Sequence, residues 1–270
     1  MLSQLRVPWA FLVRDYRLDV SYKLGFLFRV TSAMLNVAIY YFIARVFNTT
    51  AAPYLNAYGG SYFAFVIIGV AFSEYMSIGI SAIGDSVRDG QTTGTLELLL
   101  LSPTQLLTTL LSSSLWSYVF ATLRVFVYLI VGIFLGIDYG NANIPFALLA
   151  LIVSIISFNA LGLFAASVII LMKRGDPLGW ALRVSSMMLS GVYYPINVLP
   201  GWLRFVGQAL PLTHSLELLR RSLLLGEGFA QLGGELLLLA GLTAILLPIG
   251  LLACHIAINI ARVDGSLSHY

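Results

Sequence analysis

The chain has 270 residues, of which 59% are hydrophobic and 10% charged, with a mean hydropathy of +0.91 and a net charge of +3. A soluble domain usually carries about a quarter charged residues, so this composition excludes a surface that faces water throughout and predicts one membrane domain over residues 1–270. In such a chain we attribute the excess of basic residues to cytoplasmic helix ends rather than to nucleic-acid binding. The single cysteine, Cys254, excludes an intrachain disulfide and a cysteine-rich metal site.

The first 23 residues predict an interfacial helix rather than a cleavable signal peptide. Apolar residues between Trp9 and Phe28 alternate with Arg14, Asp15 and other charged residues, and no small-residue cleavage site follows a short apolar core. A helix of this kind lies in the headgroup layer, with its aromatic residues at the interface. The alternative is a simple cytoplasmic extension of the first spanning helix.

Six later windows are long and apolar enough to cross a bilayer, which takes about 20 residues. We therefore predict an all-α integral membrane fold with six transmembrane helices. The expected spans cover about residues 24–47, 62–83, 106–135, 145–172, 178–198 and 236–260.

Lysine and arginine positions predict that both termini are cytoplasmic. Basic residues precede the first span, follow the second, fourth and sixth, and are missing from the linkers after the first and third. The linker between spans five and six breaks this pattern with Arg204, Arg220 and Arg221, for which Glu217 and Glu227 are available as partners.

Residues 85–103 form the longest charged interruption and predict a cytoplasmic coupling loop. Turn formers and charges open it, Thr95 is suited to cap a short helix, and Pro103 ends that helix. The result is a short apolar surface helix with one acid, Glu97. Such a patch indicates contact either with a partner protein or with lipid headgroups.

Residues 190–228 stay apolar while containing three prolines, at 195, 200 and 211. Proline interrupts helices, and broken backbone at membrane depth needs surrounding protein or a wet cavity. We expect a helix that breaks near Pro195 and continues as short re-entrant helices. Two interpretations stay open: an external gate, or a cap that only seals a dimer.

Few ionisable residues lie inside the expected spans, and the deepest are Glu74 and Arg124. Either they form a structural ion pair, or Glu74 faces a translocation path. Arg45 lies near a helix end and can extend to the interface, and Arg183 can reach the cytoplasmic side. Five tyrosines fit an aromatic belt on the external side: Tyr40, Tyr41, Tyr54, Tyr58 and Tyr62.

The chain shows no sign of catalytic chemistry of its own. It has no GxxxxGK[ST] phosphate-binding loop, so it cannot bind and split ATP in the usual way. Its histidines, His214, His255 and His269, lack metal-ligand spacing, and no catalytic triad is evident. We expect no enzyme activity, no metal and no cofactor on this chain.

The chain resembles an ABC-2 type transporter permease, the membrane subunit of a bacterial ABC exporter. The resemblance lies in VRDYRLDVSYKL (13–24), in GTLELLLLSPT (94–104) after the second span, and in SGVYYPINVLPGWL and PLTHSLELLRRSLLLG (190–226). It implies an elbow helix over 13–23 and a coupling helix within 88–101 that docks on the ATPase. The implied coupling residues are Arg88, Asp89, Gly94, Thr95, Leu96, Glu97, Leu98 and Leu99. The implied re-entrant gate comprises Tyr193, Tyr194, Pro195, Leu199, Pro200, Gly201 and Trp202.

The resemblance also implies partners and a location. Two permeases, identical or homologous, would work with two ATPases that hold ATP and Mg²⁺, in the bacterial cytoplasmic membrane. The cargo would be hydrophobic, amphiphilic or drug-like and would move along the permease interface, lined by spans one, two and five. The alternatives are a glycan-exporting permease, suggested by the Arg14–Asp15 pair, and a stand-alone secondary transporter, which would normally show internal repeats and ionisable residues at the midplane.

Overall fold

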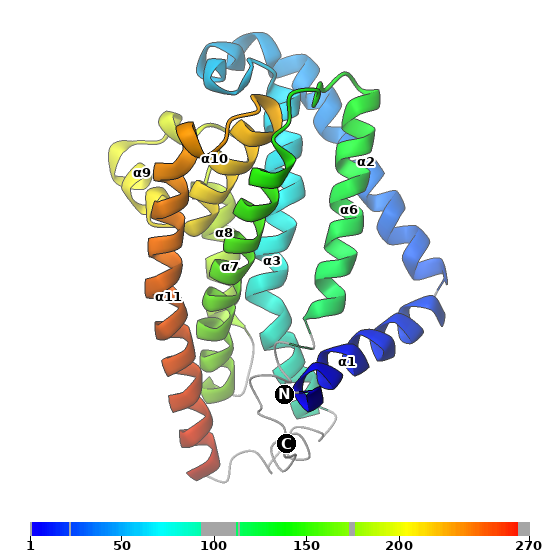
Figure 1. Cartoon of the computed structure of the whole chain (residues 1–270), viewed down its shortest axis with the longest axis vertical. Helices are drawn as coiled ribbons and strands as arrows, with labels where there is room; N and C mark the ends of the chain where they lie inside the picture. The colour runs from blue at the N-terminus through cyan, green and yellow to red at the C-terminus, as the bar shows by residue number, and fades with distance from the viewer. Residues whose placement is uncertain (1, 22, 93–111, 113, 173–175, 264–270) are drawn as a thin grey trace.

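Helices account for all regular structure in the part of the chain that the computed structural model describes, which is residues 2–21, 23–92, 112, 114–172 and 176–263 (Figure 1). The α-helices are α1 (Leu2–Ser21), α2 (Lys23–Ala51), α3 (Tyr62–Thr92), α6 (Leu115–Phe134), α7 (Ile144–Met172), α8 (Pro177–Leu189), α9 (Gly201–Gln208), α10 (Pro211–Leu224) and α11 (Phe229–Val263). Three short 3-10 helices connect them: η1 (Ala52–Tyr54), η2 (Asn56–Tyr58) and η3 (Ile196–Val198).

Four of the described helices are long and apolar enough to cross a membrane. They are α3, α6, α7 and α11, and they run along the long axis of the bundle in Figure 1. Each overlaps one of the predicted spans. The first predicted span falls within the continuous helix α2, which has 29 residues.

The fifth predicted span is wrong in its length. Helix α8 ends at Leu189, nine residues before the expected end, and its 13 residues extend about 20 Å, whereas a bilayer core is about 30 Å thick. The cause is Gly191, whose φ of +78° turns the chain out of the helix. The start of α8 is as expected, because Pro177 opens the helix and the Asp176 carboxylate caps it by accepting from the Gly179 N–H at 2.8 Å.

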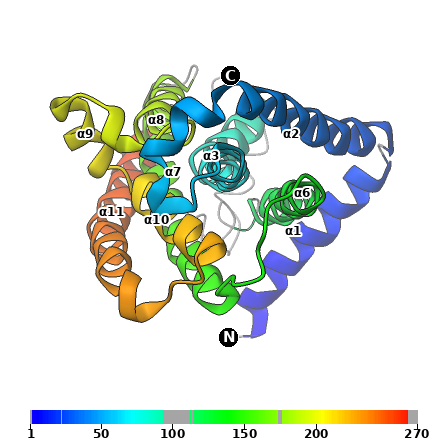
Figure 2. The same ribbon diagram turned by 90° about the horizontal axis from the view of Figure 1, so that it is seen from above.

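Helix α3 is the centre of the bundle. Seen from above, it is surrounded by α2, α6, α7, α8 and α10 (Figure 2). Its first half, from Phe63 to Ser73, is buried throughout, whereas α11 and α6 lie at the periphery and stay largely exposed. Peripheral apolar side chains such as Leu237 and Leu252 face outward, as expected of helices that contact lipid.

Glycines let three helix backbones touch. A Cβ atom at Gly162 of α7 would lie 1.9 Å from the Gly79 carbonyl oxygen of α3. One at Gly250 of α11 would lie 2.4 Å from the Ala160 carbonyl oxygen of α7. Small residues at such contacts permit the close approach by which membrane helices associate in the absence of a hydrophobic driving force.

Helix α1 is separate from α2 and runs obliquely to it (Figure 1). Trp9 and Tyr16 are exposed, and the Tyr16 ring meets Trp116 of α6 edge-on at 5.6 Å. The start of α1 and the end of α11 lie at the same end of the bundle, as an even number of crossings requires. The interfacial position of the 1–23 segment stays a prediction.

Candidate functional site

The predicted coupling segment lies mostly outside the described residues, including Gly94, Thr95, Leu96, Glu97, Leu98 and Leu99. The described part, with Arg88 and Asp89, is helical. We expected a turn from Asp85 onward, and this is wrong, because α3 continues to Thr92. No proline interrupts this stretch, the one glycine costs only about 1 kcal/mol, and Arg88 approaches Asp85 at 4.0 Å one turn away.

The break after α8 follows the predicted pattern but begins earlier than Pro195. Pro195, which is extended, immediately precedes η3, and Pro200 immediately precedes α9. The Tyr193 ring stacks on Tyr40 of α2 at 6.2 Å, and the Tyr193 carbonyl accepts from the Tyr62 hydroxyl at 3.2 Å. The break is therefore attached to α2 and to the start of α3.

The other residues of the predicted gate lie in the same break or at the start of α9. The Tyr194 hydroxyl donates to the Met188 carbonyl, and the Leu199 carbonyl is 3.4 Å from the Arg204 guanidinium. Gly201 begins α9, and Trp202 is 71% exposed. Whether the segment opens and closes stays a prediction.

Arg220 of α10 holds the break in place through several hydrogen bonds, a role that was not predicted from the sequence. Its side chain is 3% exposed, and its guanidinium donates to the carbonyls of Phe65, Gly191 and Val192 at 3.1, 2.9 and 3.0 Å. The group also lies 3.4 Å from the centre of the Phe65 ring. Buried carbonyls at a helix break need donors, and this one side chain supplies them to the turn after α8 and to α3. We call this arrangement the Arg220 cage.

A glycine makes the Arg220 cage possible. A Cβ at Gly69 of α3 would lie 2.4 Å from the Arg220 Nη2 atom and 2.5 Å from the Val192 carbonyl oxygen. A sequence signal for the burial exists, because Arg220 follows the buried Leu212 and Leu216 at intervals of eight and four residues and therefore lies on their face of α10.

The other charges of this linker follow the expectation in part. Arg221 pairs with Glu227 at 2.6 Å and with Glu217 at 3.4 Å, as predicted, whereas Arg204 donates to backbone carbonyls instead. Glu217 also accepts from the Tyr58 hydroxyl at 2.5 Å. Burial and the neighbouring Glu217 carboxylate raise the pKa of Tyr58, so that its hydroxyl stays protonated and remains a donor.

Glu74 and Arg124 form an ion pair between α3 and α6, one of the two expected alternatives, with 2.7 Å between Oε2 and Nη2. Neither is fully buried, since their side chains are 21% and 26% exposed. Arg183 likewise pairs with Asp176 at 3.1 Å near the start of α8.

Most of the accessible side chains in the second half of α3 are polar. Glu74, Ser77, Ser81, Asp85 and Arg88 recur at intervals of three or four residues, so they share one side of the helix, and each is exposed or half-buried. We call them the α3 polar stripe. Half-buried Ile78 and Ala82 lie beside the stripe, but a side of a spanning helix that carries Glu74 is not expected to face lipid tails.

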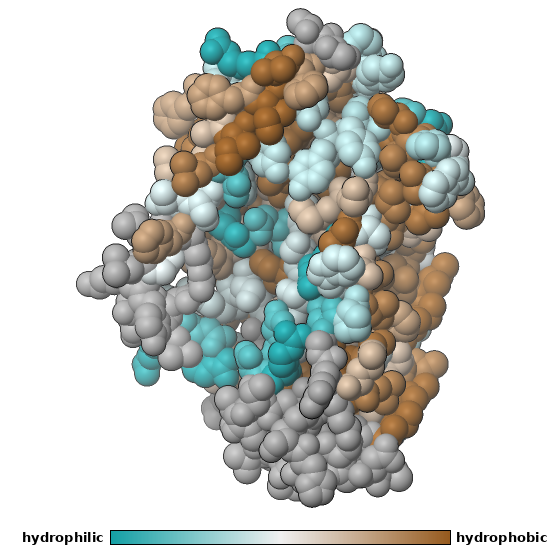
Figure 3. Space-filling view, turned by 180° about the vertical axis from the view of Figure 1, so that it is seen from behind, coloured by the Kyte–Doolittle hydropathy of each residue, from teal (hydrophilic) through white to brown (hydrophobic). Residues whose placement is uncertain are grey.

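Hydrophilic surface is visible on the back of the bundle. Figure 3 shows it between hydrophobic regions, and Figure 2 places α2 and α8 on either side of α3 at this face. The stacked Tyr40 and Tyr193 rings connect α2 to the break that follows α8. The arrangement is suited to a water-accessible path or to a second protein, and the described residues contain no group of His, Cys, Asp and Glu side chains able to hold a metal.

Comparison with known families gives the class of protein. A model of the ABC-2 type transporter family matches residues 21–224, which is more than half of the chain. The chain therefore belongs to the ABC-2 type transporter family and is a multi-pass membrane permease of the ABC class. Members of this family are transport subunits rather than catalysts. No curated protein matches the chain.

Proposed function

We propose that the chain is the membrane-spanning subunit of an ATP-binding-cassette exporter. Two permease copies form the path, and two separate ATPase subunits hold and hydrolyse Mg·ATP. The observation that carries the proposal, beside family membership, is the α3 polar stripe. Within the expected span, Glu74 would be costly against lipid tails, and together with Ser77 and Ser81 it is compatible with a wet path at a permease interface.

The path would be bounded by α2, α3 and α8. The stacked rings of Tyr40 and Tyr193 would form an aromatic section of its wall, and the α3 polar stripe would form a polar section. A path with both aromatic and polar walls suits an amphiphilic or drug-like cargo, which offers an apolar body and a polar end. Export from the cytoplasm across the plasma membrane, with both chain termini cytoplasmic, is part of the proposal.

Coupling would run through α3. This helix is continuous from Tyr62 to Thr92 and leads into the segment that carries Glu97. Force applied there by the ATPases would move α3 as a rod. The other end of α3 contacts the Arg220 cage, so the same movement would reach the break after α8. ATP shifts the path only if the ATPase binds the two permease states with different affinity.

The experiment is ATP-driven uptake of a fluorescent amphiphile by vesicles that contain the chain and its ATPase. We expect uptake that needs both subunits and a loss of uptake in Glu97→Ala at normal expression. Asp138→Asn, at an exposed acid in the turn after α6, is the matched control and should leave uptake largely intact. Uptake by the chain without an ATPase would contradict the proposal and favour a secondary transporter.

The path is tested separately with single cysteines in a Cys254→Ala background. Ser81→Cys on the α3 polar stripe should react with a membrane-impermeant thiol reagent in at least one nucleotide state. Leu252→Cys, 61% exposed on the apolar surface of α11, should stay unreactive because the reagent does not enter lipid. Protection of Ser81→Cys in every nucleotide state would refute the assignment of the path.

A further inference from the structure

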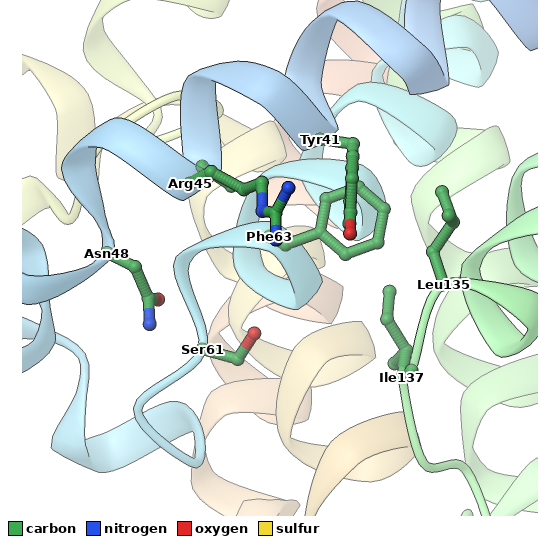
Figure 4. A pocket seen from close by; sticks show the side chains of 9 residues that line it. Tyr41, Arg45, Asn48, Ser61, Phe63, Leu135 and Ile137 are labelled. Carbon is green, nitrogen blue, oxygen red and sulfur yellow. The ribbon is translucent and has the colours of Figure 1, made fainter.

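A pocket lies at the end of the bundle opposite the start of α1, between α2, the start of α3 and the turn after α6. Its volume is about 170 Å³. The side chains in Figure 4 extend from these three segments toward a shared space. The lining residues are Tyr41, Ala44, Arg45, Asn48, Ser61, Phe63, Leu135, Gly136 and Ile137.

Arg45 gives this pocket its charge. The guanidinium is exposed and lies 5.7 Å from the centre of the Tyr41 ring. None of the ion pairs formed among the described residues involves Arg45. Asp138, the acid of the adjoining turn, instead accepts from the Gly140 N–H at 2.8 Å. The pocket thus contains a positive charge, and a guanidinium carries N–H donors that match the oxygen atoms of a phosphate or carboxylate.

The polar rim of the pocket is held in place by hydrogen bonds. The Asn48 side-chain oxygen accepts from the Tyr62 N–H at 3.1 Å, and the Ser61 hydroxyl accepts from the Ala64 N–H at 3.3 Å. These bonds fix the first turn of α3 beside Arg45. The amide nitrogen of Asn48 carries further N–H donors, which are suited to the oxygen atoms of an anion.

Apolar surface flanks the pocket on both sides. On α2, Phe42 and Val46 are 63% and 71% exposed, and at the end of α6, Ile133 and Phe134 are 56% and 84% exposed. An arginine at the end of an apolar helix, with tyrosine beside it, is typical of the depth at which lipid headgroups lie. An occupant that matches the whole site has a phosphate and hydrocarbon chains together.

We propose that this pocket binds a phospholipid, with its phosphate on Arg45 and Asn48 and its acyl chains against the exposed faces of α2 and α6. The lipid would join α2 to the turn after α6, two segments whose side chains line the same pocket (Figure 4). The site is independent of cargo and of ATP, so it does not rest on the export proposal.

The test is titration of the full-length chain, purified and delipidated in a nonionic detergent, with a short-chain fluorescent phosphatidylglycerol. Loss of one charge-assisted contact should weaken binding by about tenfold in Arg45→Gln. The matched control is Arg204→Gln, an arginine on α9 outside the pocket, which should bind as the wild type does. Arg45→Lys keeps the charge without the planar set of donors and should recover part of the affinity lost in Arg45→Gln.

Further measurements separate the possible sources of binding. Leu135→Trp, which fills the pocket with apolar volume and leaves Arg45 in place, should displace the lipid as well. Equal affinity in the wild type and Arg45→Gln overturns the proposal. It is also overturned if diacylglycerol without phosphate binds as tightly, or if inorganic phosphate competes at concentrations similar to those of the lipid.

Discussion

The Arg220 cage leads to the sharpest prediction. Arg220→Met keeps much of the side-chain length but removes every donor. The carbonyls of Gly191 and Val192 then lose the guanidinium, at about 1–3 kcal/mol for each buried group left unsatisfied. The contact with the Phe65 ring contributes about 2 kcal/mol when desolvated. The apolar methionine avoids the cost of burying a charge and recovers part of this. We expect a net loss of about 3–5 kcal/mol in the free energy of unfolding.

The assay is reversible unfolding of the purified chain in mixed micelles with increasing denaturing detergent. Arg221→Met is the matched control, since the adjacent Arg221 is 28% exposed and pairs with acids, and its loss should cost about 1 kcal/mol or less. Arg220→Lys should lie between the wild type and Arg220→Met, because one ammonium cannot reach all three carbonyls. Equal stability of Arg220→Met and Arg221→Met would refute the view that the cage holds the break together.

Three further changes test other contacts of the bundle. Gly162→Ala pushes a methyl group into the backbone of α3 and should destabilise the chain by about 1–3 kcal/mol in the same unfolding assay, whereas Gly234→Ala, which meets open space, should be neutral or slightly stabilising. Glu74→Leu leaves Arg124 unpaired, and a double-mutant cycle with Arg124→Leu should give a coupling energy of about 0.5–3 kcal/mol; a coupling near zero would show that the pair is incidental. Trp202→Cys should react with a thiol reagent added to intact cells, and full protection would contradict an external position of the break.

Hydropathy predicted the long helices well, because a spanning helix must be apolar over its whole length. The fourth predicted span, 145–172, differs from α7 by one residue at its start. Hydropathy averaged over a window does not predict where a helix ends when a single residue reverses the direction of the chain. The window 178–198 stays apolar through Gly191, although the left-handed turn at this glycine ends the helix. In the same way, charge suggested a loop after Ile83, but helical hydrogen bonding continues α3 through those residues.

The candidate site was predictable only in part, for a similar physical reason. Glu74 and Arg124 could be matched because each was an isolated charge in an apolar span, and few partners were available. The Arg220 cage uses backbone carbonyls from two distant segments, and carbonyls have no sequence signature. Arg220 was therefore expected to pair with Glu217 or Glu227, although its spacing from Leu216 indicated the buried face of α10.

The glycine contacts of α3 with α7, and of α7 with α11, bear on how the bundle deforms. Two backbones in direct contact cannot slide past one another without a clash, so a tilt imposed on the long central helix is shared by both neighbours. Any displacement delivered at Thr92 would therefore rotate a three-helix block. The helices outside this block, which are the short α8 together with α2 and α6, would move relative to it.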